Sequence, residues 1–301
     1  MKSLRQYVKE ASESKTAVAH FNISNLEGFW AVVKAAQVVS KEIGLTNEQT
    51  IPVIIGTSEG EREVIGLDQA VALVQSLRVK GQPVFLNADH TYSFEKVKEA
   101  LDAGYDMAIF DGAKLSMEEN IIEAKKCVEY AKDLMQKTGR DILIEGELGY
   151  IGQSSKVLDA IPDGASLSVD SLTKPEDAIR FVNETGVDLL APAVGNFHGM
   201  LRGGVDPALN IEAVASVYNV VKIPLVLHGA SGNSAEDVKK SIENGVGIVH
   251  VSTELRFAYT QALRKYLAEN TDENTPYKIT ASAGLAMQKV AEEKIRIDLR
   301  L

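Results

Sequence analysis

The feature that most restricts the possible folds is an alternation of two kinds of segment along the chain. Eight short apolar segments recur, and most are separated by stretches whose apolar residues are spaced three and four apart, as Phe94, Val97 and Leu101 are. Short apolar runs are typical of buried strands, and a spacing of three and four is typical of amphipathic helices. The apolar segments are residues 17–23, 52–58, 83–89, 107–112, 142–148, 188–194, 224–229 and 247–253.

This alternation predicts an α/β fold, and eight strand-then-helix units in about 250 residues predict a (β/α)8 TIM barrel. A doubly wound open sheet is the alternative, and the lack of a G-x-G-x-x-G motif after the first apolar segment disfavours it. The 301 residues contain no long linker or low-complexity segment. We therefore expect a single domain, residues 1–301, with an extra C-terminal helix over residues 280–297 packed outside the barrel.

Serine and glycine mark several of the expected helix ends. Ser93, Ser116 and Ser234 each follow an apolar segment and precede a helical pattern, so they are predicted to be N-caps. Gly104 is predicted to end the helix that begins after Ser93. The longest connection, residues 149–172, follows the fifth apolar segment, and a loop of this length often covers an active site. We expect it to act as a lid.

The composition excludes several classes of partner. The net charge of −10 argues against nucleic acid and anionic membranes, although backbone N–H groups can still bind a small phosphate on an acidic protein. One cysteine, Cys127, excludes an internal disulfide and a cysteine-based metal cluster, and it favours a reducing compartment. The segment MKSLRQYVKEASESK lacks the apolar stretch of a signal peptide, and no run approaches the roughly 18 apolar residues of a membrane span. We expect a cytoplasmic protein.

Histidines and acids gather at the C-terminal ends of the predicted strands. The histidines there are His90, His198, His228 and His250, at the third, sixth, seventh and eighth apolar segments. The acids there are Asp89, Asp111, Glu145 and Glu147. Because the strands of a barrel place their C-terminal ends around its active site, one rim is predicted to collect these groups.

Three histidines from separate strands, with a carboxylate or water, can form a zinc site with an open coordination position. A lone histidine is more often a hydrogen-bonded structural residue, whereas three on one rim favour a metal site. The fifth histidine, His20, lies mid-strand without a carboxylate neighbour. We expect His20 to be structural.

Two glycine- and serine-rich segments suggest phosphate binding. The segment LHGASGNSAEDV passes from His228 through Gly229 and Ser231 into a helix, and HVSTELR places Ser252 and Thr253 before another helix. Exposed backbone N–H groups at a helix start can bind phosphate, and the loops after strands seven and eight of a barrel often do so. An ordinary βα turn is the alternative for each loop.

Several motifs resemble those of the class II, metal-dependent ketose-bisphosphate aldolases. They occur in the order expected of that family and span almost the whole chain, and fructose- and tagatose-bisphosphate aldolases are both similar to it. The motifs are AVAHFNISNLEGFWAVVKAA, NADHTYSFE, IFDGAKLSMEENI, EGELGYIG, TGVDLLAPAVGNFHG, PLVLHGASG and VHVSTEL.

The resemblance implies roles for individual residues. It implies Zn²⁺ on His90, His198 and His228, where the ion acts as a Lewis acid on the ketone oxygen of the substrate. It implies Asp89 as the group that donates and accepts a proton at the oxygen of the aldehyde fragment. The acids implied at an alternative or second metal position are Asp111 and Glu147. The implied substrate-binding positions are Asn22, Ser58, Gly199, Gly229, Ala230, Ser231, His250, Val251, Ser252 and Thr253. A requirement for a monovalent cation is left open, and a homo-oligomer, a dimer or larger, is expected by resemblance.

The sequence departs from the family pattern at three places. Serines 154–155 stand in the loop where an acid that exchanges the substrate proton is expected, and Asp159 or Asp163 would have to reach inward instead. His250 replaces the usual asparagine of the eighth strand, and residues 200–202 replace a lysine often found after the HG pair. These changes concern the half-site of the ketose and leave the implied metal ligands and Asp89 intact.

The leading hypothesis is a zinc-dependent aldolase of carbohydrate metabolism and glycolysis. This lyase would reversibly cleave fructose 1,6-bisphosphate to dihydroxyacetone phosphate and glyceraldehyde 3-phosphate. One alternative is an aldolase for another phosphorylated ketose, such as tagatose 1,6-bisphosphate, and another is a barrel that binds a sugar phosphate without turnover. A metal-dependent amidohydrolase is disfavoured, because the first apolar segment contains one histidine and no H-x-H pair.

Overall fold

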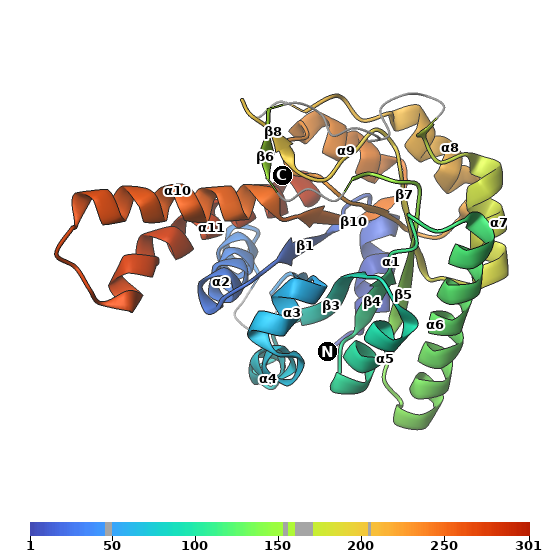
Figure 1. The fold of residues 1–301 in the computed structure, drawn as a ribbon, viewed down its shortest axis with the longest axis horizontal. Coiled ribbons are helices and arrows are strands. Elements are labelled where there is room, and N and C mark those ends of the chain that lie inside the picture. Colours follow the sequence, from blue (N-terminus) through green and yellow to red (C-terminus); the bar gives the residue numbers. More distant parts are fainter. Residues whose placement is uncertain (46–49, 153–155, 160–170, 204–205) are drawn as a thin grey trace.

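The computed structural model describes residues 1–45, 50–152, 156–159, 171–203 and 206–301, and its centre is a closed barrel of parallel strands (Figure 1). Each of the eight apolar segments coincides with most or all of one barrel strand, so the predicted (β/α)8 TIM barrel is confirmed. The barrel strands, in order around it, are β1 (Val18–Asn22), β2 (Val53–Thr57), β3 (Val84–Thr91), β4 (Met107–Phe110), β5 (Leu143–Leu148), β7 (Leu189–Pro192), β9 (Leu225–Leu227) and β10 (Val246–Val251). Strand β10 pairs with β1 and closes the sheet.

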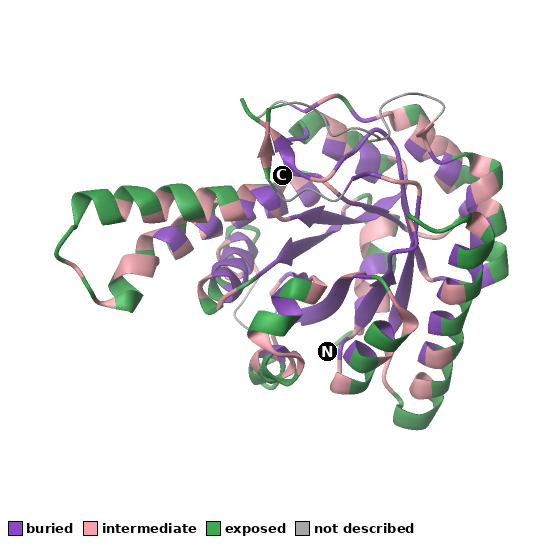
Figure 2. Ribbon diagram, viewed as in Figure 1, coloured by how far each residue is buried: buried purple, intermediate pink, exposed green. Residues whose placement is uncertain are grey.

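Helices surround the barrel with mixed exposed and buried residues, whereas the barrel strands are buried except at His90, which is partly exposed (Figure 2). The predicted caps are confirmed: Ser93, Ser116 and Ser234 each accept a hydrogen bond from a backbone N–H three residues later, and Gly104 ends α5. The helices are α1 (Leu4–Ser14), α2 (Leu26–Glu42), α3 (Glu59–Ile65), α4 (Leu67–Arg78), α5 (Phe94–Ala103), α6 (Met117–Thr138), α7 (Pro175–Thr185), α8 (Ile211–Val221), α9 (Ala235–Glu243), α10 (Thr253–Glu269) and α11 (Pro276–Asp298).

Helix α1 closes the end of the barrel opposite the predicted active site, and the sequence analysis did not anticipate it. Its Leu4 and Val8 belong to the same buried cluster as inward-facing strand residues such as Phe85 and Ile248. Arg5 fixes the helix from outside the cluster, with Nη1 2.5 Å from Asp188 Oδ1. Because apolar side chains fill this end of the barrel interior, we expect the polar site at the opposite end.

The C-terminal helix predicted over residues 280–297 is confirmed, although it begins earlier, at Pro276. Helix α11 packs against α2 and α10, and α10 with the start of α11 projects away from the barrel (Figure 1). A partly buried ion pair joins the two helices near the barrel, with Lys294 Nζ 2.6 Å from Glu254 Oε2. In the part of the chain that the structure describes, no helix is long and apolar enough to cross a membrane.

A small second sheet lies over the rim of the barrel, where β6 (Val157–Leu158) pairs in parallel with β8 (Met200–Leu201). The backbone N–H of His198 also donates to the carbonyl of Ile151 at 2.9 Å. The described parts of the connection after β5 are therefore attached to the segment that carries His198. The remainder of the predicted lid, including Ser154, Ser155 and Asp163, lies outside the described residues.

Candidate active site

A pocket of about 190 Å³ opens at the C-terminal end of the barrel strands, where the sequence predicts an active site. It is lined by Asn22, Ser58, Asp89, His90, Tyr92, His198, Gly199, His228, Gly229, Ser231, His250, Ser252, Thr253 and Arg256. Most of the predicted site residues are therefore brought together. Ala230 and Val251 are buried next to the lining and not part of it, so only their backbone could face a ligand.

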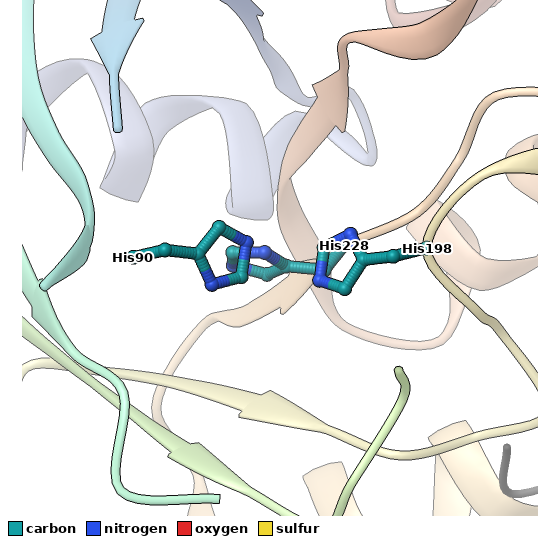
Figure 3. A group of neighbouring side chains, drawn as sticks. All are labelled: His90, His198 and His228. Carbon is teal, nitrogen blue, oxygen red and sulfur yellow. The ribbon is translucent and has the colours of Figure 1, made fainter. Parts of the chain in front are cut away.

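Three histidines from different segments of the chain converge at the C-terminal end of the barrel strands (Figure 3). His90 is the penultimate residue of β3, His198 lies in the connection after β7, and His228 directly follows β9. The ring centroid of His90 is 4.5 Å from that of His198 and 5.0 Å from that of His228. Each of the three residues offers one ring nitrogen, and these nitrogens lie within 4.8 Å of one another. His198 Nε2 and His228 Nδ1 are buried without a hydrogen-bond partner. A bound cation would satisfy these two lone pairs, so the residues fit a metal.

Carboxylates hold the other nitrogens of two of these rings. His90 Nδ1 is 2.9 Å from Asp111 Oδ2, and His228 Nε2 is 2.7 Å from the fully buried Glu145 Oε1. A hydrogen bond of this kind fixes the tautomer and orientation of a metal-binding imidazole. Glu145 thus has an orienting position, which the sequence indicated only as part of the acidic rim.

Asp111 and Glu147 form a second group with His90, at the place implied for an alternative metal position. Glu147 Oε2 lies 3.6 Å from His90 Nδ1 and has no hydrogen-bond partner. Burial and the charge of Asp111 raise the pKa of Glu147 to about 8. Two buried acids this close together favour a neighbouring cation, because a cation offsets both their desolvation and their repulsion.

Asp89 lies beside His90 on β3 and faces the pocket, with 2% of its surface exposed. Its Oδ2 accepts a hydrogen bond of 2.8 Å from Asn22 Nδ2, and its Oδ1 lies 3.4 Å from His250 Nδ1. Burial alone would raise the pKa of Asp89, but the neighbouring His90 and His250 outweigh it and hold this pKa well below its ordinary value. Asp89 therefore places a buried carboxyl group in the pocket, where it can exchange a proton with a ligand.

The expectation that His20 has no carboxylate neighbour is wrong. A nitrogen of His20 lies within 4.8 Å of ligand atoms of Asp89 and His250, and its ring stacks on that of His250 with centroids 3.4 Å apart. Burial lowers the pKa of His20 to about 3, so the ring is neutral. The error arose because the carboxylate comes from β3, two strands away around the barrel.

The glycine–serine loop after β9 approaches the pocket closely. Gly229 has φ +61°, and a Cβ at this position would lie 2.2 Å from the carbonyl oxygen of Phe197, so a side chain would be both strained and obstructed. Ser231 Oγ accepts a hydrogen bond of 3.3 Å from the backbone N–H of Glu254 in the first turn of α10. The loop and Thr253 therefore meet at the N-terminus of α10, where the helix dipole favours an anion.

Arg256 is a pocket residue that the sequence analysis missed. Its Nη2 lies 2.5 Å from Glu61 Oε1. Among the described residues that line the pocket, Arg256 is the only lysine or arginine. Glu61 Oε2 also accepts hydrogen bonds from Asn22 Nδ2 at 3.0 Å and from the backbone N–H of Ser58 at 2.8 Å. The sequence signal that could have identified Arg256 was its position three residues after Thr253, because this spacing places both side chains on the same face of a helix.

These features define a TIM barrel with a candidate metal centre beside a candidate anion-binding loop. The family described as "Fructose-bisphosphate aldolase class-II" matches residues 2–299. The chain belongs to this class II aldolase family, whose members are metal-dependent lyases acting on phosphorylated sugars, and the predicted family membership is confirmed.

Individual relatives support this membership along the whole chain. The fructose-bisphosphate aldolase of Staphylococcus epidermidis is 33% identical over 298 residues, which cover 98% of this chain and 96% of the relative. That of Geobacillus stearothermophilus is 32% identical over 299 residues, covering 98% and 95%. Among solved structures, the YdjI aldolase from Escherichia coli K12 has a TM-score of 0.76 and 30% identity, covering 98% and 96%. A putative fructose-1,6-biphosphate aldolase from Coccidioides immitis has a TM-score of 0.78 and 26% identity, covering 98% and 95%.

Proposed function

We propose that this aldolase is zinc-dependent and reversibly cleaves fructose 1,6-bisphosphate to dihydroxyacetone phosphate and glyceraldehyde 3-phosphate. The observation that carries the proposal is the buried carboxylate of Asp89 in the same pocket as three converging histidines, two of which have unpartnered nitrogens. A proton-transfer group beside a Lewis-acid site is the equipment that aldol cleavage needs. The names of the relatives support the choice of fructose 1,6-bisphosphate.

In this proposal His90, His198 and His228 hold the catalytic ion, and Asp111 with Glu147 offers a second position for it. Borderline-soft Zn²⁺ suits an all-imidazole site with room for substrate oxygens. When bound, the ion supplies a Lewis acid that withdraws electrons from the ketone and offsets the negative charge left after cleavage. Glu145 and Asp111 keep the rings oriented for this role.

Asp89 moves the proton at the oxygen of the aldehyde fragment. In cleavage its carboxylate takes the proton of the substrate hydroxyl whose oxygen becomes the aldehyde carbonyl, and in synthesis it returns that proton. Asn22 holds Oδ2 of the carboxylate and is itself held by Glu61, so the acid is oriented before the substrate arrives.

The two phosphate groups of the substrate have two candidate binding regions. We assign the phosphate of the dihydroxyacetone half to the loop of Gly229 and Ser231 with Thr253, where backbone N–H groups meet the start of α10. We assign the other phosphate to Arg256 and Ser58 at the mouth of the pocket. The guanidinium of Arg256 is held by Glu61 and is therefore available in one place.

The group that exchanges a proton with the carbon of the dihydroxyacetone fragment is not assigned. Of the acids considered in the sequence, Asp159 does not reach inward: it lies at the surface with Oδ1 2.5 Å from Arg202 Nε. Asp163 lies outside the described residues, as do the serines at 154 and 155.

A second candidate function is cleavage of a different phosphorylated ketose, such as tagatose 1,6-bisphosphate. His250 favours it, because an imidazole lines the pocket where the family usually has an asparagine amide. A barrel that binds a sugar phosphate without turnover is disfavoured by the presence of Asp89 beside the three histidines.

Further expectations about domain, pathway, location and assembly remain part of the proposal. The chain forms one domain, residues 1–301, and works in glycolysis in the cytoplasm, which suits its single, buried cysteine. It forms a homo-oligomer, a dimer or larger, as the resemblance implies. A requirement for a monovalent cation stays open.

The test of the proposed function is zinc quantification combined with cleavage of a panel of ketose phosphates. We expect one divalent ion per chain and the highest kcat/KM for fructose 1,6-bisphosphate. A higher kcat/KM for tagatose 1,6-bisphosphate would select the second candidate, and binding without cleavage of any member would select the non-catalytic barrel.

We predict that Arg256→Gln raises KM for a ketose bisphosphate by roughly 10-fold or more, since hydrogen bonds to charged groups contribute about 1.5–3 kcal/mol. The matched measurement uses the ketose 1-phosphate, which lacks the second phosphate and should lose little. An equal loss for both substrates would show that Arg256 does not bind the second phosphate.

A further inference from the structure

His20 lies next to His250 inside the barrel because of the strand register. Strands β1 and β10 are hydrogen-bonded neighbours, and their register pairs His20 directly with His250. The two rings are parallel within 3°, with centroids 3.4 Å apart. On its other side the ring of His250 meets the ring of His228, at 4.1 Å between centroids. His250 is thus enclosed between two imidazoles.

The ring of His20 occupies space that only a glycine on the next strand leaves open. A Cβ at Gly56 on β2 would lie 2.1 Å from His20 Cε1, and the backbone of Gly56 is not in a conformation that itself requires glycine. The far edge of the ring is held on β3, where His20 Nε2 lies 3.1 Å from the side-chain amide nitrogen of Asn87. His20 is fully buried and is not part of the pocket lining.

A series of side-chain contacts leads from Asn87 to the proton-transfer group, Asp89. Asn87 and Asp89 are two residues apart on β3 and both point into the barrel, as the alternation of a strand requires. Asn87 contacts His20, and His20 stacks on His250, whose Nδ1 lies 3.4 Å from Asp89 Oδ1. The carboxylate oxygen can only accept, so a hydrogen bond between these two atoms requires the proton of the imidazole to be on Nδ1 of His250.

The distance of 3.4 Å is longer than an ordinary hydrogen bond, which makes the contact sensitive to small movements of the ring. Oδ1 of Asp89 has no hydrogen-bond partner in the part of the chain described, and neither ring nitrogen of His250 has one. The orientation of His250 therefore depends on the rings that pack against it. One of these, His228, is a candidate metal ligand, and the other, His20, has no assigned role.

We propose that His20 is a positioning residue of the aldolase reaction: its stacked ring sets the plane of the His250 imidazole, from which Nδ1 holds Oδ1 of Asp89 during proton transfer. The inference rests on the proposed function, because the proton transfer is that of the aldol cleavage. It gives one shared role, the orientation of the Asp89 carboxylate, to Asn87, His20 and the space left open at Gly56.

The test is a double-mutant cycle of His20→Ala and His250→Asn, read as kcat and KM of the zinc-loaded enzyme. We expect His20→Ala to lower kcat by roughly 10- to 100-fold with KM nearly unchanged, because misplacing a reacting group by about 1 Å can cost ~10²-fold. In the His250→Asn background the same substitution should have little further effect. An equal fall in kcat in both backgrounds, or an unchanged kcat for His20→Ala alone, would overturn the proposal.

Two variants separate positioning from folding. His20→Phe keeps a ring for the stack and loses the bond to Asn87, so it should recover most of the kcat lost in His20→Ala. Thr57→Val is the matched control, because Thr57 is a buried neighbour of Gly56 whose hydroxyl bonds Tyr105 and not the site. Thr57→Val should lower stability and leave kcat unchanged. A His20→Phe enzyme as slow as His20→Ala would show that the stack does not act.

A measurement without turnover distinguishes this inference from the proposed function. In ¹⁵N-histidine-labelled, zinc-loaded protein, the His250 signals, identified by their loss in His250→Asn, should show the Nδ1–H tautomer in the wild type and a mixture in His20→Ala. An Nε2–H tautomer in the wild type, or an unchanged tautomer in His20→Ala, would overturn the inference. If the wild type cleaves no ketose phosphate, the proposed function fails while these spectra still decide the role of the stack.

Discussion

Asp89→Asn is expected to lower kcat by about 10² to 10⁴-fold, the usual contribution of a general acid–base group. The amide has nearly the shape of the carboxylate but cannot accept the proton of the substrate hydroxyl. Metal content should be unchanged, because the nitrogens of His90, His198 and His228 that form the candidate metal group remain in place. The measurement is steady-state kinetics of cleavage, with zinc quantified in the same preparation.

Asp89→Ala, which removes both oxygens, should be at least as slow. Asp102→Asn is the control of the same chemistry: Asp102 lies at the end of α5 and pairs with Lys98 at the surface, so its loss should not change kcat. Near wild-type turnover in Asp89→Asn would remove Asp89 from the proton-transfer step.

His90→Ala is expected to lose the metal and, with it, the activity. Removing one of three imidazole ligands leaves an incomplete site and also frees Asp111 and Glu147 from their shared neighbour. The zinc content of the purified variant should fall to background, whereas the slow Asp89→Asn variant should retain zinc. Full zinc content in His90→Ala would show that the ion is held elsewhere in the pocket.

His250→Asn separates the three-histidine site from a larger one. It should retain zinc, because His90, His198 and His228 already converge without it. Loss of zinc in this variant would make His250 a fourth ligand.

Much of this site could be predicted from the sequence because a barrel imposes a simple rule. Each apolar segment ends at the same rim, so His90, His198 and His228 could be expected together without knowledge of the path between them. Asp89 followed from the same rule and from the family motif around it. The helix caps at Ser93 and Ser116 were predictable for a different reason, since capping depends on a few consecutive residues.

What the sequence did not predict depends on contacts between segments that are distant in the chain. His20 was expected to be a structural residue without a carboxylate neighbour, yet the closing pair of strands places it against His250, and Gly56 and Asn87 complete its surroundings. Register around a closed barrel is set by packing of the whole sheet and not by any local motif. Helix α1 and the β6–β8 pair were missed because their positions likewise depend on the assembled barrel.

The central claim is that carbon–carbon cleavage in this pocket depends on a metal ion held by His90, His198 and His228. It is tested most directly by measuring the release of dihydroxyacetone phosphate from ketose bisphosphates before chelation, after complete removal of metal, and after return of Zn²⁺ or Co²⁺. The expected result is loss of activity without metal, recovery with either ion, and no inactivation when borohydride is added with substrate. Full activity of a verified metal-free protein, with borohydride trapping the substrate on a lysine, would contradict the account.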